Sequence, residues 1–146
     1  MNSDIVILDG AVATDDRGCV RFVNDFDFSR VKRFYQVENH KRGFIRAWHG
    51  HKKEAKYVYV PKGTAVIGVV KLPLSSTSES HNPEKFILSA NKPQILYIPK
   101  GFANGAMTLE ENTIIQYFST SSLEESIGDD IRFAHNKWDI WKSEYR

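Results

Sequence analysis

Two histidines, His49 and His51, stand two residues apart within residues 46–56. In an extended strand, side chains at this spacing point to the same face. Imidazole changes its charge near neutral pH, so two such rings on an inner face can bind a metal ion or transfer protons. The alternative is that both merely end a strand, and the His-x-His spacing does not by itself decide between these interpretations.

A metal site built on His-x-His would add a glutamate some residues later and a third histidine on a distant strand. Glu54 lies closer to the pair than that pattern requires, and Asn104 follows the turn at residues 99–101, where the third histidine is expected. Asparagine is a poor ligand for transition metals. Cys19 is the only cysteine, which excludes Cys-rich zinc sites. We therefore expect proton chemistry with no metal and no cofactor.

Lys56 and Tyr117 are the natural partners for such chemistry. A carbanion next to a ketone needs positive charge near the developing enolate oxygen, and Lys56 on the next expected strand can supply it. Tyr117 carries a phenol that can deliver a proton from the opposite side, although a tyrosine on a strand is more often a packing residue. Arg46 has the planar guanidinium that matches phosphate oxygens.

Arg46 and His49 are an odd number of residues apart, so strict alternation would place them on opposite faces of a strand. Both can line one pocket only if the strand bends or bulges near Trp48.

The elements that must position these residues are short and rich in branched or aromatic side chains, with turn-forming residues between them. The expected strands cover residues 5–8, 20–23, 31–38, 44–48, 56–60, 64–72, 85–88, 94–98 and 113–118. Their spacing of roughly ten residues is typical of an antiparallel sandwich or barrel. Residues 73–83 are Ser-rich and predict a surface loop, and residues 122–126 predict one helical turn. The sequence therefore predicts one all-β domain over residues 1–146.

Composition excludes several function classes. The chain has 146 residues, 41% hydrophobic and 26% charged, which fits one globular domain. A net charge of +2 gives no strong field for nucleic acid or an anionic membrane. The N-terminus does not resemble a signal peptide, and no apolar run approaches the roughly 20 residues of a membrane span. We expect a cytoplasmic protein without nucleic-acid or membrane partners.

Several motifs occur in an order that is similar to one known family. They are Asp16-Arg17-Gly18, residues 35–40 (YQVENH), residues 46–49 (RAWH), Lys56, residues 96–105 (LYIPKGFANG) and Tyr117. This order, over roughly residues 14–141, resembles the dTDP-4-keto-6-deoxyglucose 3,5-epimerase family of sugar-nucleotide cupins. Residues 31–52 are also similar to the dTDP-4-keto-6-deoxyglucose 3,4-ketoisomerases, whose His-x-His matches His49 and His51.

The resemblance to the epimerases implies a jelly-roll cupin β-barrel that acts as a homodimer on a nucleotide-diphosphate sugar, without metal or organic cofactor. It also implies a role in polysaccharide biosynthesis. By position, His49 matches the base that removes the proton α to the ketone. Lys56 matches the cation that stabilises the enolate, and Tyr117 matches the acid that reprotonates the other face.

The same resemblance implies the substrate contacts. Arg46 matches a contact to the diphosphate, and Gln36 and Asn39 match positions near the nucleotide. Arg17 matches a position that reaches the nucleotide, with a dimer partner's site as one possibility. Asn104 stands where the family carries histidine, and we expect it to line the substrate site.

One departure concerns the partner of the catalytic histidine. In the family, this partner is an aspartate carried by a C-terminal extension. The sequence stops at Arg146, before any such segment, so we expect that dyad to be absent. His51, Glu54 or Asp139 would then take its place, with His51 as an orienting or substitute base.

Both family reactions begin with loss of a proton next to the C4 ketone. Return of the proton to the opposite face gives an epimer, whereas an ene-diol moves the carbonyl to C3. Tyr117 favours the first outcome, and the histidine pair and the short C-terminus favour the second. We expect an epimerase; the alternatives are a 3,4-ketoisomerase and a non-catalytic cupin that binds sugar nucleotides.

Overall fold

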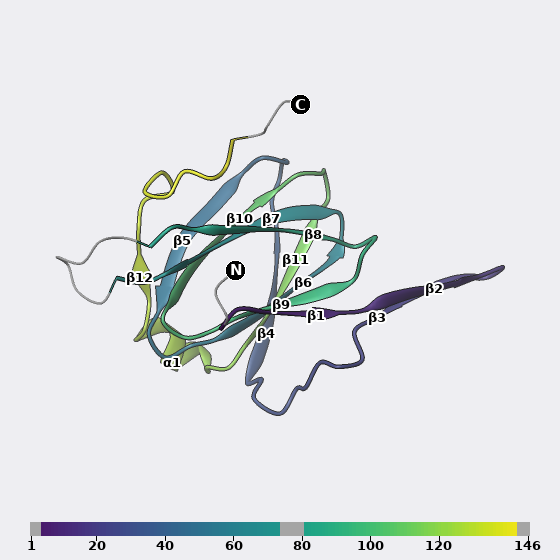
Figure 1. Ribbon diagram of the computed structural model, residues 1–146, viewed down its shortest axis with the longest axis horizontal. Helices are drawn as coiled ribbons and strands as arrows, with labels where there is room; N and C mark the ends of the chain where they lie inside the picture. Colours follow the sequence, from purple (N-terminus) through teal and green to yellow (C-terminus); the bar gives the residue numbers. More distant parts are fainter. Residues whose placement is uncertain (1–3, 74–80, 143–146) are drawn as a thin grey trace.

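Two antiparallel five-stranded sheets form a jelly-roll β-barrel in the computed structural model, which describes residues 4–73 and 81–142 (Figure 1). The first sheet has the order β1 (Val6–Asp9), β9 (Gln94–Ile98), β6 (Lys56–Lys62), β11 (Ile114–Ser119) and β4 (Arg33–Glu38). The second has the order β12 (Ile131–Arg132), β5 (Ile45–His51), β10 (Phe102–Thr108), β7 (Thr64–Lys71) and β8 (Glu84–Ser89). The short helix α1 (Leu123–Ile127) precedes β12.

The main core lies between the two sheets. Alternate residues of β6 and β7 face inward, so that Val58, Val60, Ile67 and Val69 are almost completely buried. This period of two is what the sequence predicts for half-buried strands. Burial of each such side chain contributes about 1.5–3 kcal/mol relative to exposure. The core side chains fill the space between the sheets at one end of the barrel, and polar residues lie between the sheets at the other end.

A second apolar cluster covers the outer face of β5, β10 and β7. Residues 133–142, called the strap below, pack there, and Trp138 and Trp141 of the strap contact Trp48 of β5 with ring centroids 5.4 and 5.2 Å apart. A side chain at Gly68 would lie 2.6 Å from the Trp48 ring. A side chain at Gly105 would collide with Ala47. Both glycines are therefore needed for the close approach of β5 and the strap.

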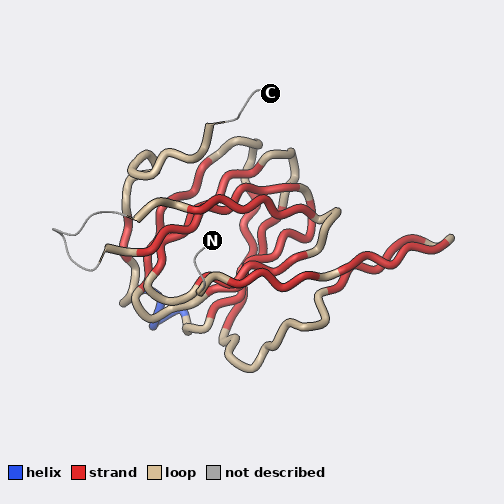
Figure 2. The backbone as a smooth tube through the Cα atoms, in the orientation of Figure 1, coloured by secondary structure: helices blue, strands red, loops and turns tan. Residues whose placement is uncertain are grey.

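β2 (Ala11–Asp15) and β3 (Gly18–Phe22) form a two-stranded hairpin, called the arm below, that projects from the barrel (Figures 1 and 2). Val12 and Val20 are exposed on it. Arg17 lies in the turn between the two strands. A hairpin of two strands is only marginally stable in water. The exposed apolar side chains would therefore stabilise the arm if it packed against another surface.

The described strands differ from the expected ones at three places. β2, β10 and β12 were not expected from the sequence. β10 reads Phe-Ala-Asn-Gly-Ala-Met-Thr, and its small residues have low strand propensity. The helical turn expected at residues 122–126 is found as α1, with Ser122 as its N-cap. Most of the loop expected at residues 73–83 lies outside the described residues. In the described parts of the chain, no helix has the length and apolarity needed to cross a membrane.

Candidate active site

A cavity of about 320 Å³ opens at the polar end of the barrel, between the two sheets. The first sheet contributes Arg33, Tyr35, Val37, Lys56 and Tyr117, and the second contributes Arg46, His49, His51, Asn104 and Arg132. Leu123, Ser126, Ile127 and Asp130, from α1 and the turn after it, complete the wall. The cavity therefore brings together residues from nearly the whole length of the chain.

A bulge in β5 allows Arg46 and His49 to face this cavity together. Asn104 pairs with His49 whereas Gly105 pairs with Ala47, so Trp48 is the extra residue in β5. The Ala47–Trp48 peptide bond is cis. Trp48 is fully buried against the strap on the outer face, and Arg46 and His49 both line the cavity. The irregularity that the sequence requires near Trp48 is thus confirmed.

Positive charge dominates the cavity. Arg33, Arg46, Lys56 and Arg132 line it, and Asp130 is the single carboxylate among its described lining residues. Low-dielectric walls concentrate the field of such charges and favour an anionic ligand. The electrostatics of the cavity thus suit phosphate or a developing oxyanion, although the net charge of the chain is close to zero.

His49 presents a free imidazole to the cavity. Among the described residues, none forms a hydrogen bond with its ring, and the side chain is half-buried. Burial, together with the positive charges of Lys56 and Arg132, lowers the pKa of His49, and Asp130 opposes this shift. At neutral pH the ring is therefore uncharged and able to accept a proton.

His51 differs from His49 because both of its nitrogens face protein groups. Nδ1 lies 2.9 Å from the backbone carbonyl oxygen of Asp129, which can only accept a hydrogen bond. Nε2 lies 3.1 Å from a carboxylate oxygen of Glu54. The side chain is only 5% exposed. Burial lowers the pKa of His51, and Lys56 adds to this effect. The surroundings of His51 suit an orienting residue rather than a base that meets a ligand.

Lys56 lies over two stacked tyrosine rings. Tyr35 and Tyr117 pair in register on β4 and β11, with centroids 5.0 Å apart and an interplanar angle of 15°. The Lys56 Nζ is 5.8 Å from the Tyr35 centroid and 5.6 Å from that of Tyr117. Burial lowers the pKa of Lys56, with Glu54 opposing it. Burial raises the pKa of Tyr117, which keeps its phenol protonated.

Two asparagines brace the strands around the cavity. Asn39 accepts a hydrogen bond of 2.7 Å from Arg46 Nε and donates to the carbonyl oxygen of Phe44. Asn104 donates to the carbonyl oxygen of His49 over 3.4 Å and itself lines the cavity. Asn39 therefore orients the guanidinium of Arg46, and Asn104 supports the strand at His49.

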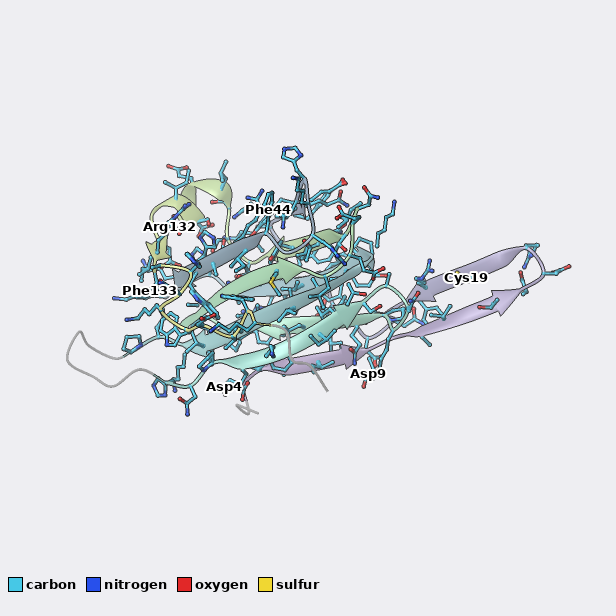
Figure 3. All side chains as sticks on the ribbon, turned by 90° about the horizontal axis from the view of Figure 1, so that it is seen from above. Asp4, Asp9, Cys19, Phe44, Arg132 and Phe133 are labelled. Atoms are coloured by element: carbon cyan, nitrogen blue, oxygen red, sulfur yellow. The ribbon has the colours of Figure 1, made fainter. Side chains whose placement is uncertain are left out.

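Three residues expected at the substrate, Asn39, Gln36 and Arg17, do not line the cavity of a single chain. Gln36 points to the outer face of β4, where its amide donates to Gln116 over 2.8 Å. Arg17 lies on the arm and forms an exposed ion pair with Asp15. Figure 3 labels Arg132, which lines the cavity, at one end of the long axis and Cys19, on the arm, toward the other.

Sequence reasoning missed five polar lining residues, which are Arg33, Tyr35, Ser126, Asp130 and Arg132. Arg33 and Tyr35 alternate along β4 with the outward-facing Gln36, so the period of two could have indicated that they share one face. The sequence does not show which strands pair, however, and so does not show that this face lines the cavity. Asp130 and Arg132 depend on the two-residue strand β12, which has no sequence signature. Asp139, expected as a possible partner of His49, is exposed on the strap and does not line the cavity.

The described residues contain no group of three or more His, Cys, Asp or Glu side chains placed to hold a metal ion. The absence of a cofactor from the reaction stays a prediction.

A jelly-roll barrel with a polar, cation-lined cavity between its sheets defines the class of this protein as an all-β cupin. The family model described as dTDP-4-dehydrorhamnose 3,5-epimerase matches residues 2–144. The chain belongs to this family, as its motifs indicate. The family is one of isomerases.

Known relatives agree with this assignment. The chain is 29% identical over 139 residues to the spore coat polysaccharide biosynthesis protein SpsL of Bacillus subtilis, which covers 91% of each chain. It is similar in structure to dTDP-4-dehydrorhamnose 3,5-epimerase from Sulfolobus tokodaii, with a TM-score of 0.77 and 25% identity over 96% of this chain and 84% of that one. The Bacillus anthracis enzyme of the same name, solved with TDP and PPi bound, has a TM-score of 0.75 and 23% identity over 96% and 86%.

Proposed function

We propose that this protein epimerises a dTDP-linked 4-keto-6-deoxy sugar by removing a proton next to the ketone and returning it to the opposite face. One observation carries the proposal. His49 and Tyr117 belong to opposite sheets and line the same cavity, with Lys56 beside Tyr117. A planar enolate bound between the sheets would present one face to each group. Membership of the epimerase family supports the same reaction.

The proposed reaction uses each group in the protonation state that its surroundings favour. Neutral His49 takes the proton from the carbon α to the ketone, and the C–H electron pair forms the enolate. The Lys56 ammonium faces the enolate oxygen, where positive charge is worth most in a dry site. Tyr117 then donates its phenolic proton to the other face of the same carbon. The proton on His49 returns through solvent to the Tyr117 phenolate, so that no proton or electron is gained or lost and no cofactor is needed.

The remaining cations would hold the diphosphate. Arg46, oriented by Asn39, and Arg132 stand at the cavity with planar guanidinium groups that match phosphate oxygens. The relative from Bacillus anthracis was solved with TDP and PPi, which are anions of this chemistry. We place the product in polysaccharide biosynthesis, the role that names the Bacillus subtilis relative.

The 3,4-ketoisomerase reaction is the alternative on the same substrate class. In the sequence, the pair of histidines and the short C-terminus favoured it, and the surroundings of the histidines bear on the first of these. His51, however, has both ring nitrogens engaged by Asp129 and Glu54. The geometry thus supports one histidine base and favours epimerisation.

The test is proton NMR of the protein with dTDP-4-keto-6-deoxyglucose in D₂O, with wild type and His49→Gln run in parallel. We expect deuterium to enter C3 or C5 with inversion in the wild type. We expect the rate to fall about 10²–10⁴-fold in the variant, since this is roughly what a general base contributes. A carbonyl that migrates to C3 would replace the epimerase by the ketoisomerase. Binding of TDP without any exchange by the wild type would refute the enzymatic proposal.

We also propose that the protein acts as a homodimer in which the arm of one protomer packs on its partner. The arm exposes Val12 and Val20 and carries Arg17 in its turn. Among the described residues of one chain, the Arg17 side chain pairs only with its near neighbour Asp15. A second protomer would cover the apolar side chains and bring Arg17 to the nucleotide in the partner's cavity.

A further inference from the structure

Glu54 lies directly behind the cavity wall and contacts three residues that line it. Its side chain is completely buried, and it is absent from the lining itself. One carboxylate oxygen accepts a hydrogen bond of 2.7 Å from Ser119 and lies 3.3 Å from Arg33 Nη2. The other oxygen lies 3.1 Å from His51 Nε2 and 3.6 Å from Lys56 Nζ.

The Glu54 carboxylate balances the positive charges of Arg33 and Lys56, which would otherwise repel each other. Arg33 and Lys56 are both cations at the same wall, and Lys56 is only 8% exposed. A buried ammonium without a counter-ion tends to lose its proton, because desolvation disfavours its charged form. Glu54 itself stays ionised: burial raises its pKa, but the hydrogen bond from Ser119 and the charges of Lys56 and His51 lower it further.

We propose that Glu54 is the positioning residue of this site, and that its buried carboxylate holds the Lys56 ammonium charged and directed at the enolate oxygen. This role rests on the proposed function, because only a reaction through an enolate requires a cation at that place. Lys56 remains the catalytic residue, since it is Lys56 that would touch the substrate.

The same geometry fixes what His51 does. Its Nδ1 must carry a proton, because the facing carbonyl oxygen of Asp129 only accepts. Its Nε2 lies 3.1 Å from a buried oxygen of the Glu54 carboxylate, which has no hydrogen bond within the described residues. His51 therefore acts as a partner of Glu54, and the histidine pair divides into a positioning residue and the proposed base, His49.

The charges that face Lys56 come from every element around it. β4 contributes Arg33 and Tyr35, β5 contributes His49 and His51, and β11 contributes Tyr117; Glu54 precedes β6, and Asp130 follows α1. Of these, Glu54 and Asp130 favour the protonated form, whereas Arg33 opposes it, and burial opposes it most. Loss of the Glu54 charge leaves Asp130 alone against burial and Arg33. We expect the pKa of Lys56 to fall.

A first experiment needs no substrate. In protein labelled with ¹³Cε-lysine, the Lys56 signal is identified by its absence from Lys56→Met and titrated with pH in wild type, Glu54→Gln and the control Asp9→Asn. Asp9 is an exposed carboxylate on β1 that accepts a hydrogen bond from Gln94. We expect the Lys56 midpoint to fall by about one pH unit or more in Glu54→Gln, with no change in Asp9→Asn. An unchanged midpoint in folded Glu54→Gln overturns the proposal.

A second variant covers the case in which Glu54→Gln does not fold. Glu54→Asp keeps the charge but withdraws it by one methylene, and we expect a smaller fall of the Lys56 midpoint in the same direction. A midpoint equal to that of the wild type in this variant, with Glu54→Gln unfolded, likewise refutes the role.

A kinetic experiment separates positioning from mere stability. The rate of deuterium exchange is measured against pH, and the alkaline limb should move to lower pH by the shift seen for Lys56. On that limb kcat should be reduced about tenfold or more, with KM within threefold. A uniform loss of activity at every pH, without a moved limb, indicates a structural role. Absence of exchange in the wild type refutes the proposed function instead, and the titration of Lys56 still tests Glu54.

Discussion

His49 and His51 show how surroundings divide two identical side chains. Both lie on β5 and line the same cavity. His51 is held through both nitrogens, whereas among the described residues no hydrogen bond reaches the His49 ring. Because burial, Lys56 and Arg132 all lower its pKa, His49 enters the reaction as a neutral base. The hydrogen bonds and charges around each ring therefore determine the different roles of the two histidines.

We predict that His49 titrates below the ordinary histidine pKa of about 6.5. Asp130 raises the pKa of His49, so Asp130→Asn should move the midpoint to still lower pH. Titration of the ¹H–¹³C signals of the His49 ring by NMR measures both midpoints. A His49 midpoint at or above the ordinary value of about 6.5, or an upward shift in Asp130→Asn, would contradict this electrostatic account.

The sequence predicts those cavity residues that can be recognised from their side-chain chemistry and their spacing along a strand. His49, His51, Lys56, Tyr117 and Asn104 all line the cavity, and their roles stay predictions. Glu54, weighed only as a ligand or as a partner for His49, instead lies behind Lys56. Its importance depends on four contacts, each from a different strand. Such convergence is a property of the fold that no local pattern contains.

At the scale of elements, Asp129 ties the segment after α1 to the loop that carries Glu54. Its carboxylate accepts hydrogen bonds from the backbone amides of Lys52, Lys53 and Glu54, at 2.9, 2.9 and 3.0 Å. These three amides belong to the turn between β5 and β6. Among the described residues, none of them forms a hydrogen bond within a sheet. One side chain thereby fixes the turn from which the positioning carboxylate is presented to the cavity.

We predict that Asp129→Asn destabilises the protein by roughly 1–3 kcal/mol at pH 7 and Asp129→Ala by roughly 4.5 kcal/mol or more, because the three hydrogen bonds to this charged group are worth about 1.5–3 each. Burial raises the pKa of Asp129, but the three amides lower it further. Its contribution is therefore present above the unfolded pKa of about 3.9 and is lost as pH falls through the lower folded value. Urea unfolding at pH 7, 5 and 3.5 should show the difference between wild type and Asp129→Asn shrinking with acid. A constant difference would count against the charge as its source.

Element prediction succeeds where branched residues alternate and fails where small residues pack. β7, with Thr-Ala-Val-Ile-Gly-Val-Val-Lys, was expected from the sequence. β10 was not, because it uses Ala103 and Gly105 to admit Ala47, Trp48 and the strap. The bulge in β5 was required only by the chemistry of Arg46 and His49. Strand propensity considers one strand in isolation. The small residues of β10 and the bulge of β5 instead depend on what packs against these strands.

At the scale of the whole molecule, the arm determines whether one chain or two complete the site. Arg17 cannot be assigned to the cavity of its own chain, since the arm projects from the barrel (Figures 1 and 3). In the part of the chain that the structure describes, β2 and β3 pair with each other and with no further strand. A closed dimer with two-fold symmetry would place both arms in equivalent positions.

We predict that inactive Arg17→Ala and His49→Gln proteins regain activity when mixed, unfolded and refolded together. In a mixed dimer, the chain with intact His49 receives Arg17 from its partner, which rebuilds one complete site. Random pairing gives half mixed dimers, hence about a quarter of the wild-type sites. Light scattering should give about twice 16.7 kDa for each protein. Activity that stays at the level of the separate variants would show that Arg17 does not act across the dimer.

The contact of Trp48 with Trp138 and Trp141 has a spectroscopic consequence. These are all three tryptophans of the chain, and their rings lie within 5.4 Å of Trp48 on the side of the second sheet away from the cavity. At such separations the indoles absorb as a coupled group, and their emission reports one place. Intrinsic fluorescence is therefore a probe of how the strap is seated, while ligand binding between the sheets is better followed through the tyrosines that line the cavity.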